Sequence, residues 1–405
     1  MRTAYFLSAF PSTSETFVLH QAVGALQEGH QVDIHAYEVA GHVKHPLLDA
    51  YGLLDHVNYR PSVPTNKLIR LFKVCFLIFF LLFIDTRRCA GLFSLWKETP
   101  LNEWLELFFL AWSLRGGKSY DVIHAHFGPN GLMAIRLRQA GFLQGKVVTS
   151  FHGFDANVVP NILGKKYYHS LFEQGEAFVV SSKFIQKKLL ALGLNKEKVH
   201  RIAVGIDVNM WTFQERQGWQ HAFPMVLSVG RLMEVKGFTY AMEAMVKVRK
   251  FFPSVQYHLV GEGPLQGVLE QQLRGLDLQD CVHLLGNKNQ AELNAIYQKA
   301  DLFVMPSVRT NDGAEEGQGM VLFEAQAAGL PVVATCSGGI AESLPEDAVL
   351  IRERNSDDLA ERIIEQLQAL QEQGYDGIKG RIFVQQHFEV GRLNKKILEL
   401  YQGLL

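Results

Sequence analysis

Apolar runs of strand length alternate with segments of helical periodicity along most of the chain, and this alternation constrains the fold more than any other feature. In the N-terminal half, the first apolar run is followed by a helical pattern that ends at Gly29. Strands that alternate with helices predict a parallel sheet with crossover helices. The strands predicted in this half are residues 3–9, 31–38, 121–128, 146–153, 177–182 and 199–207.

The same pattern starts again after residues 207–222, where the periodicity lapses. A chain of 405 residues also exceeds the usual size of one hydrophobic core. The fold class that we predict is therefore α/β, with two doubly wound, Rossmann-like domains that face each other across a cleft. The strands predicted in the second half are residues 225–232, 255–264, 282–286, 301–307 and 331–335.

The predicted domain boundaries follow from this repeat. They give an N-terminal domain of residues 1–207 and a C-terminal domain of residues 208–385. Residues 386–405 form a last helix that we expect to pack back on the N-terminal domain. Doubly wound sheets bind ligands at the carboxyl ends of their strands, so the residues that carry chemistry should lie there.

Composition and charge exclude several classes of protein. The net charge is −1, which gives no overall field for nucleic acid. The four cysteines form no CxxC pair, which fits a reducing cytoplasm. We find no metal-ligand spacing and no DxD-type pair near a strand end, so we predict no metal and no cofactor. The N-terminal apolar run is short and enters a polar turn, so we do not interpret it as a signal peptide.

The segment 67–88 departs from the alternating pattern. It contains eleven consecutive apolar residues, Val74 to Ile84, which is fewer than the roughly 20 of a membrane-spanning helix. Two interpretations remain open, a buried helix or an interfacial helix whose phenylalanines enter one leaflet beneath a basic collar. We favour the second, because a buried helix rarely needs so many cations at both ends. The cations are Lys67, Arg70, Lys73, Arg87 and Arg88.

Two cations and a glycine pair mark strand ends in the second half. Arg231 and Lys236 lie in "GRLMEVKG" after the first strand, where a guanidinium and an ammonium suit a diphosphate. The alternative is a pair of solvated loop cations. Gly261 ends the next strand in "LVGEGP" and would let the backbone approach a ligand. This pair lacks the third glycine of the dinucleotide fingerprint.

Two glutamates lie on either side of a predicted helix start in "EEGQGMVLFE". Free amides and the helix dipole make such a start an anion site. Glu316 precedes it and suggests contact with sugar hydroxyls, while Glu324 lies about one turn into the helix. If Glu316 were helical too, eight residues would separate the two carboxylates by about 12 Å. That exceeds the roughly 5–9.5 Å of a glycosidase pair, so each should hold a different part of one extended ligand. We interpret Glu315 as a solvated charge.

Three histidines lie on or after the predicted strands 121–128 and 146–153. His152 follows a strand in "SFHGFD", beside Asp155, and is a candidate functional residue. His124 and His126 share the strand "IHAHFG", and we expect them to face opposite sides of it. His126 is nearer to the strand end and should line the cleft, whereas His124 should be a hydrogen-bonded core residue.

The motifs "GRLMEVKG", "LVGEGP" and "EGQGMVLFEAQAAGLPVVAT" together resemble those of glycosyltransferase family 4. Members of this family have the GT-B fold and are retaining and metal-independent. The resemblance extends over nearly the whole chain. The N-terminal "FPSTSETFVLHQ" and "IHAHFG" are similar to the branch that builds bacterial exopolysaccharide, colanic acid or lipopolysaccharide.

The resemblance implies roles for the candidate residues. Arg231 and Lys236 would neutralise the donor diphosphate, and Glu324 would bind the ribose. Glu316 and His152 would act at the donor sugar. The remaining donor contacts would be Gly261 and the amides of Gly319, Met320 and Val321. Family members often have glycines after the first strand. Here Ser14, Glu15 and Thr16 replace them, which suggests hydroxyl contacts at the acceptor or cleft, together with His126 and Asp155.

The function expected from this resemblance is the retaining transfer of a hexose from a nucleotide-diphosphate sugar. A UDP-sugar is favoured, with a GDP-sugar as the alternative. The acceptor would be a hydroxyl of a lipid-linked bacterial polysaccharide or oligosaccharide, bound by the N-terminal domain. The enzyme would be cytoplasmic and peripheral at the inner leaflet. The alternatives are a non-catalytic nucleotide-sugar-binding scaffold and a GT-B enzyme with a soluble acceptor.

Overall fold

The computed structural model describes residues 1–12, 15–39 and 45–405 and divides the chain into two compact units. Unit 1 consists of Met1–Val180, Gln186–Ile202 and Asn394–Leu405, and unit 2 of Ser181–Ile185 and Ala203–Leu393. The main change of unit thus falls at residue 203, a few residues before the predicted position. The last residues of the chain belong to unit 1.

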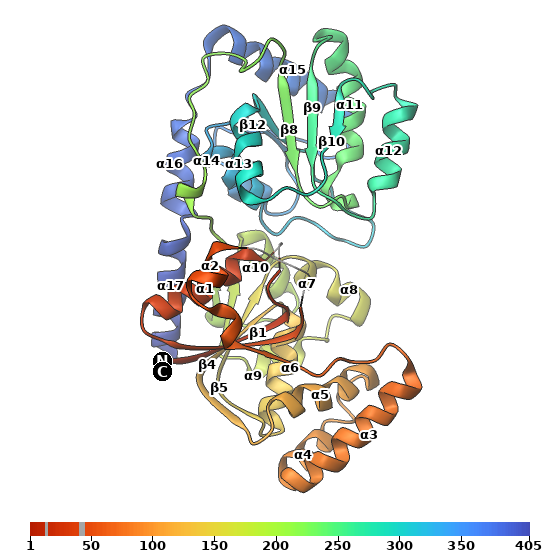
Figure 1. The fold of residues 1–405 in the computed structure, drawn as a ribbon, viewed down its shortest axis with the longest axis vertical. Coiled ribbons are helices and arrows are strands. Elements are labelled where there is room, and N and C mark those ends of the chain that lie inside the picture. Colours follow the sequence, from red (N-terminus) through yellow and green to blue (C-terminus); the bar gives the residue numbers. More distant parts are fainter. Residues whose placement is uncertain (13–14, 40–44) are drawn as a thin grey trace. The chain divides into compact units, whose positions relative to one another are not determined.

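Unit 1 contains a parallel sheet in the order β3-β2-β1-β4-β5-β6-β7. Figure 1 labels β1, β4 and β5 of this sheet. Its central strands are apolar and buried, as expected when helices cover both faces. The strands are β1 Arg2–Ala9, β2 Gln31–Glu38, β3 Val57–Tyr59, β4 Lys118–His126, β5 Leu143–Phe151, β6 Ala177–Val180 and β7 Val199–Arg201.

The α-helices α1 to α9 lie in unit 1, and α10 begins in unit 2 and continues into unit 1. Their bounds are α1 Thr16–Gln27, α2 Pro46–Ala50, α3 Lys67–Ile84, α4 Thr86–Ser94, α5 Leu101–Ser113, α6 Gly128–Gln139, α7 Phe154–Asn157, α8 Val159–Leu163, α9 His169–Gln174 and α10 Lys183–Ala191. Helices α4 and α5 and strand β3 were not predicted.

Unit 2 contains a second parallel sheet, in the order β10-β9-β8-β11-β12-β13. Its strands are β8 Met225–Val229, β9 Gln256–Val260, β10 Val282–Leu284, β11 Leu302–Met305, β12 Val332–Thr335 and β13 Val349–Ile351. The remaining helices are α11 Phe238–Phe251, α12 Gln266–Gly275, α13 Gln290–Lys299, α14 Met320–Ala327, α15 Ser356–Gln373, α16 Ile378–His387 and α17 Val390–Leu404. Helix α17 begins in unit 2 and continues into unit 1 from Asn394. The prediction of two doubly wound α/β domains is confirmed.

Each sheet reverses its strand order at one point, between β1 and β4 in unit 1 and between β8 and β11 in unit 2. Chain segments diverge from the sheet at such a point and leave room for a ligand beyond the carboxyl ends of the strands. The predicted site residues follow these strands or their neighbours, so the topology gathers them at the edges where ligands bind.

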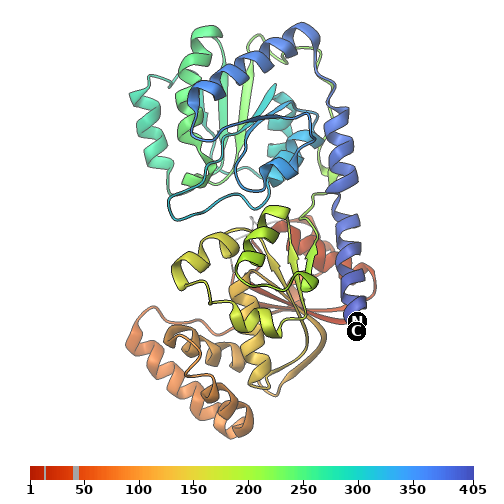
Figure 2. The same cartoon turned by 180° about the vertical axis from the view of Figure 1, so that it is seen from behind.

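Helices α3, α4 and α5 form a helical layer that projects from the sheet of unit 1 (Figures 1 and 2). Helix α3 packs against α4 and α5 through Val74, Leu77 and Leu81, which are buried. Most of its other apolar side chains are exposed, so α3 is not the fully buried helix of the first interpretation. Within residues 1–12, 15–39 and 45–405, no helix has the length and apolar character to cross a membrane.

Candidate active site

The site in unit 2 is built around Lys236. This residue ends a short 3-10 helix, Glu234–Lys236, between β8 and α11. The turn is fixed because Gly237 has φ of 64° and its Cα packs against the carbonyl of Pro306, where a Cβ would lie 1.9 Å from the oxygen. Val308 also donates its amide to the Val235 carbonyl at 2.9 Å. The loops after β8 and β11 are therefore held together at the point where the strand order reverses.

Lys236 forms an ion pair with Glu316, with 2.8 Å between Nζ and Oε1. Both side chains are largely buried, so little water screens this contact. Lys236 also lies near enough to Glu324 to lower the pKa of that carboxyl. The structure thus brings together Lys236 and the two glutamates that the sequence separates by eight positions.

Glu324 lies in α14 and accepts a hydrogen bond from the Tyr297 hydroxyl at 2.9 Å. Burial raises the pKa of Glu324 to about 7, and the Tyr297 hydrogen bond and Lys236 oppose this rise. A carboxyl with this pKa exists in both protonation states near neutral pH. Its ability to accept hydrogen bonds from a ligand therefore depends on pH in this range.

Glu316 lies in the loop before α14 and not in a helix, so the 12 Å estimate from helical rise does not apply. Hydrogen bonds fix three consecutive residues of this loop. The Glu316 carbonyl accepts from the Gly339 amide at 2.8 Å, and the Gly317 carbonyl accepts from Ser182 Oγ at 2.8 Å. The Gln318 side chain donates to the Val204 carbonyl and accepts from its amide. The position of Glu316 is thus imposed by its surroundings.

The start of α14 agrees only in part with the predicted anion site. The Gly319 amide donates to Ser343 Oγ at 3.2 Å, so it is not free to bind a phosphate in this structure. This corrects the expectation that three successive amides are open. Met320 and Val321 begin the helix, where backbone amides have no acceptor within the helix itself. These two amides remain the candidates for phosphate.

The other predicted residues of unit 2 lie near the same edge. Arg231 follows β8 and is exposed. Gly261 follows β9 with φ of 135°, and a Cβ there would lie 2.0 Å from the Gly230 carbonyl oxygen, so no larger residue fits. Glu315 is not the solvated charge that we expected. Its side chain is 12% exposed, and its Oε2 lies 3.9 Å from Arg309 Nε.

In unit 1, His126 and His152 meet at the ends of β4 and β5. His126 Nδ1 lies 3.1 Å from His152 Nε2, and the rings are stacked. Burial lowers the pKa of His152 to about 3 and that of His126 well below its usual value, so both rings are neutral at physiological pH. Phe17, at the start of α1, has its ring centroid 4.8 Å from that of His152.

The Nε2 atom of His126 is buried without a hydrogen-bond partner. A buried unpaired N–H group is rarer in proteins than an unpaired acceptor. This favours the tautomer in which His126 donates from Nδ1 to His152 Nε2, so that His152 carries its own proton on Nδ1. His152 can then donate a hydrogen bond to a ligand oxygen while remaining uncharged.

The prediction that His124 and His126 face opposite sides of their strand is wrong. Side chains two positions apart on a strand share a face, and the two rings stack with 4.5 Å between centroids. His124 is a hydrogen-bonded core residue, as expected. Its Nδ1 contacts the Tyr401 hydroxyl at 2.5 Å and its Nε2 contacts Ser150 Oγ at 2.7 Å.

Asp155 is a positioning residue in this structure. Its carboxylate accepts hydrogen bonds from the amides of Gly128, His152 and Gly153 at 2.9–3.0 Å, and it is buried. Burial raises the pKa of Asp155, and these backbone hydrogen bonds oppose the rise. The carboxylate ties the loops after β4 and β5 to each other, which holds His152 in place.

The predicted polar residues after β1 are only partly described. Ser14 lies outside the described residues. Glu15 immediately precedes α1, and Thr16 is the first residue of that helix. Burial raises the pKa of Glu15 to about 7, and its Oε2 is buried without a hydrogen-bond partner.

Sequence reasoning missed several residues that support the site. The Tyr297 hydroxyl donates a hydrogen bond to Glu324, and Ser343 Oγ accepts one from the Gly319 amide. The partners in each pair are far apart in the sequence, and no local pattern indicates either contact. Gly338 and Gly339 could have been found, because a glycine pair follows the predicted strand 331–335. Both approach the Glu316 loop so closely that a Cβ would clash with its carbonyl oxygens.

Comparison with known proteins identifies the family. The model of Glycosyltransferase Family 4 matches residues 14–210, and that of Glycosyl transferases group 1 matches residues 209–373. The amylovoran biosynthesis glycosyltransferase AmsK of Erwinia amylovora is 34% identical over 346 residues, 84% of each chain. The chain belongs to glycosyltransferase family 4. The WcaL glycosyltransferase of Escherichia coli (strain K12), which its name assigns to colanic acid biosynthesis, is 30% identical over 417 residues, 100% of each chain.

The fold of this glycosyltransferase is likewise shared with solved structures. A crystal structure of HepE from Anabaena in complex with UDP aligns with a TM-score of 0.71 at 18% identity and covers 100% of both chains. The family and the GT-B fold that the sequence motifs indicated are confirmed.

Proposed function

We propose that this glycosyltransferase transfers a hexose, with retention of anomeric configuration, from a nucleotide-diphosphate sugar to a hydroxyl of a growing bacterial polysaccharide. The observation that carries the proposal is the ion pair of Lys236 with Glu316, beside Glu324 and the start of α14. One cation and a helix N-terminus suit a diphosphate. Two carboxylates suit the hydroxyls of the sugar and of the ribose, which flank the diphosphate in the donor.

When the donor binds, its contacts would replace some of those that the residues of this site make with one another. Its diphosphate would approach Lys236, Arg231 and the amides of Met320 and Val321. Glu316 would then accept hydrogen bonds from the sugar hydroxyls, while Glu324 would accept them from the ribose. The ion pair with Lys236 keeps Glu316 in place before the donor arrives.

In the reaction, the bond between the anomeric carbon and the leaving phosphate oxygen breaks as the acceptor oxygen bonds to the same carbon. The acceptor proton passes to the leaving phosphate. Negative charge that grows on the diphosphate would be stabilised by fixed cations and amides, without a metal ion. The neutral His152 ring would donate a hydrogen bond to a substrate oxygen.

The nature of the donor and the acceptor is proposed from the relatives. HepE was crystallised with UDP, which supports a UDP-sugar, and a GDP-sugar is the alternative. The names of WcaL and AmsK refer to colanic acid and amylovoran, which supports an exopolysaccharide product. The acceptor proposed here is lipid-linked, so the enzyme would work in the cytoplasm as a peripheral protein of the inner leaflet.

The donor is identified by a thermal-shift screen of UDP-, GDP- and ADP-sugars, since a ligand at 100 times its Kd stabilises the folded state by about 2.7 kcal/mol. Transfer and donor hydrolysis are then measured for Glu316→Gln. The expected loss in kcat is roughly 10²–10³-fold, as for removal of one fixed transition-state contact. The matched control is Glu243→Gln, a change on the exposed side of α11, which should leave kcat unchanged.

Three results would count against this proposal. Wild-type turnover in Glu316→Gln would exclude Glu316 from the reaction. Donor binding with neither transfer nor hydrolysis under any acceptor would favour a binding scaffold. A trapped glycosyl–enzyme adduct would replace the proposed front-side attack with a two-step mechanism.

A further inference from the structure

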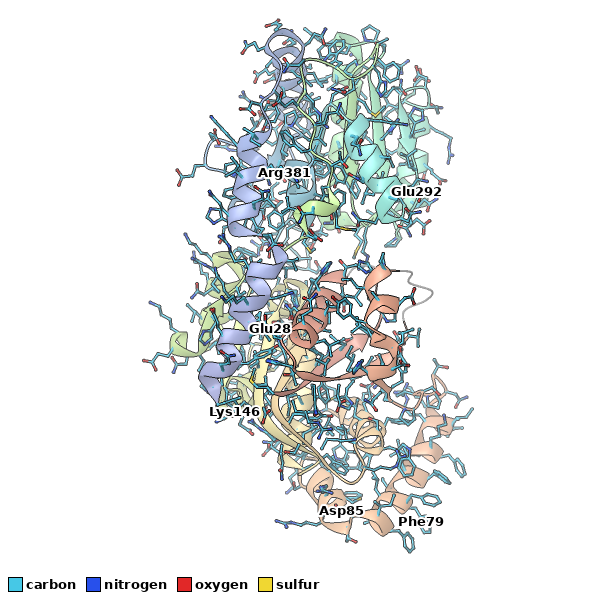
Figure 3. The ribbon with its side chains drawn as sticks, turned by 60° about the vertical axis from the view of Figure 1, so that its left-hand side comes forward. Glu28, Phe79, Asp85, Lys146, Glu292 and Arg381 are labelled. Atoms are coloured by element: carbon cyan, nitrogen blue, oxygen red, sulfur yellow. The ribbon has the colours of Figure 1, made fainter. Side chains whose placement is uncertain are left out.

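Helix α3 carries two apolar stripes on opposite sides. Val74, Leu77 and Leu81 face α4 and α5 and are buried. The second stripe recurs at helical spacing on the other side and includes Phe72 and Phe83, which are 74% and 76% exposed. Figure 3 shows Phe79, from the same stripe, directed away from the rest of unit 1. A helix that is apolar on all sides is normally covered on all sides, but no described residue of this chain covers the outward side of α3.

The outward side of α3 contains no charged residue between Leu68 and Ile84. The helix has 18 residues, so this apolar surface is about 27 Å long. Continuous exposed apolar surfaces of this kind mark sites that bind another protein or a membrane. Half of the exposed large apolar side chains of α3 are phenylalanines, a residue type that is common in helices lying in the membrane interface.

The cations of the segment lie off the apolar surface. Arg70 Nε donates to the Pro64 carbonyl at 3.0 Å and Lys73 Nζ to the Ser62 carbonyl at 3.3 Å, so both lie along the side of α3 next to residues 62–64. Arg88 is paired with Asp85. The prediction was a collar of cations at both ends of the segment. In the structure, Arg70 and Lys73 lie along one side of α3 near its N-terminal end, and Arg87 is exposed beyond its C-terminal end.

The charge of the segment selects among possible occupants. Five cations and Asp85 give residues 67–88 a formal charge of five minus one, or +4. In a symmetric dimer formed through α3, the same surface of both copies would meet, and like charges would be brought together. An anionic leaflet offers hydrocarbon for the phenylalanines and negative headgroups for the cations at the same time.

We infer that the outward side of α3 is a membrane-docking surface, which lies flat in one anionic leaflet with its phenylalanines among the acyl chains. This inference does not depend on the transferase reaction. Together with the proposed function, it brings the enzyme to the surface that carries a lipid-linked acceptor. Burial of the phenylalanines supplies most of the affinity, so binding persists at high salt and on zwitterionic vesicles, although more weakly.

The test is flotation of the full chain, without donor or acceptor, with vesicles of equimolar phosphatidylcholine and phosphatidylglycerol. The variant is Phe72→Ser/Phe83→Ser, at two of the most exposed positions of α3. Each lost phenylalanine should weaken partitioning about tenfold, for a total of about 100-fold. The matched control is Phe251→Ser/Val268→Ser, which removes two apolar side chains that are 53% and 52% exposed in unit 2. It should float like the wild type.

A second variant tests the charges without touching the aromatic surface. Lys67→Glu/Arg87→Glu should weaken binding to the anionic vesicles and leave binding to pure phosphatidylcholine vesicles unchanged. Circular dichroism and the donor-induced thermal shift show whether each variant is folded. A wild-type chain that does not float would overturn the inference. A Phe72→Ser/Phe83→Ser variant that floats normally would also overturn it. So would light scattering that shows a dimer for the wild type and a monomer for this variant, if that is the only difference between them.

Discussion

Glu324 is a carboxyl group whose pKa lies close to neutral in the folded protein. Burial raises its pKa to about 7, although Tyr297 and Lys236 favour the ionised form. A buried ionised group destabilises the folded state unless a partner compensates for its lost hydration. In the proposed function, that partner is the ribose. Ionised Glu324 therefore lowers the stability of the folded protein when no donor is bound.

The replacement Glu324→Gln should therefore stabilise the protein while it weakens donor binding. Because the folded pKa of about 7 lies above the unfolded value of 4.5, wild-type stability falls as pH rises through this window and stays low above it. At pH 8 the variant should be more stable by about 1–3 kcal/mol, with no gain at pH 4. Urea unfolding at both pH values measures this gain.

The same variant should bind the donor roughly 10–100-fold more weakly at pH 8, because hydrogen bonds to an ionised group are lost. For the wild type, donor affinity should fall as pH drops below 7, since protonation of Glu324 removes an acceptor. Isothermal titration across this range gives both quantities. A stability gain that is the same at pH 4 and pH 8 would show that Glu324 is not the titrating group.

Single residues show where sequence reasoning succeeds and where it stops. The motif around Glu316 and Glu324 was sufficient to identify both residues and the helix start between them. The partner of Glu324, Tyr297, could not be found, because their contact depends on how the Tyr297 hydroxyl of α13 reaches Val321 and Glu324 of α14. Glu315 was wrongly assigned to solvent for the same reason, since its burial depends on a loop whose course no local pattern fixes.

At the scale of elements, the loop that carries Glu316 depends on close packing against the turn after β12. Gly338 has φ of 58°, and a Cβ there would lie 2.1 Å from the Glu316 carbonyl oxygen. The neighbouring Gly339 donates its amide to that same oxygen. A glycine is thus required both by the backbone conformation and by the space next to Glu316.

The replacement Gly338→Ala should displace the Glu316 loop and lower kcat at least about tenfold, since small misplacements of reacting groups are costly. It should also reduce stability by more than about 1 kcal/mol, because alanine is strained at positive φ. Steady-state kinetics and thermal unfolding measure both.

The control Gly267→Ala changes a glycine of α12 with no atom within 4 Å of the new methyl. It should stabilise the helix slightly and leave kcat unchanged. Wild-type turnover in Gly338→Ala would mean that the loop adapts to the added methyl.

Helix α3 was the element that sequence periodicity could not resolve. Both of its sides are apolar, so the pattern fits a buried helix and an interfacial helix equally well. What separates the two is the packing of α4 and α5, which cover only the stripe that contains Leu77. These two helices were not predicted, and without them the exposed side could not be distinguished from the buried one.

At the scale of the whole molecule, the repeat of strands and helices was sufficient to predict two sheets, because buried parallel strands are nearly continuous apolar runs. The unit to which each short segment belongs was harder to predict. The start of α10 belongs to unit 2, where Glu342 accepts hydrogen bonds from the amides of Lys183 and Phe184. Such assignments depend on contacts between residues about 160 positions apart, which no local pattern reveals.

The C-terminal residues 394–405 complete unit 1 although they follow unit 2 in the chain. Tyr401 is fully buried there, and its hydroxyl contacts His124 Nδ1 in the middle of the sheet. Asn394 donates to the His20 carbonyl at 2.8 Å and fixes the start of this segment on α1. Removal of these residues would leave the buried ring of His124 with one unpaired nitrogen.

Deletion of residues 394–405 should therefore unfold or loosen unit 1 and leave unit 2 intact. Hydrogen exchange should show loss of protection in β1 and β4, while β8 and β9 stay protected. The donor-induced thermal shift should survive, because the proposed donor residues lie in unit 2. The milder change Tyr401→Phe keeps the ring and removes only the hydroxyl, so it should cost about 1–3 kcal/mol of stability in unit 1. Equal loss of protection in both sheets after the deletion would mean that the units unfold together, because a segment that supports only unit 1 cannot by itself expose β8 and β9.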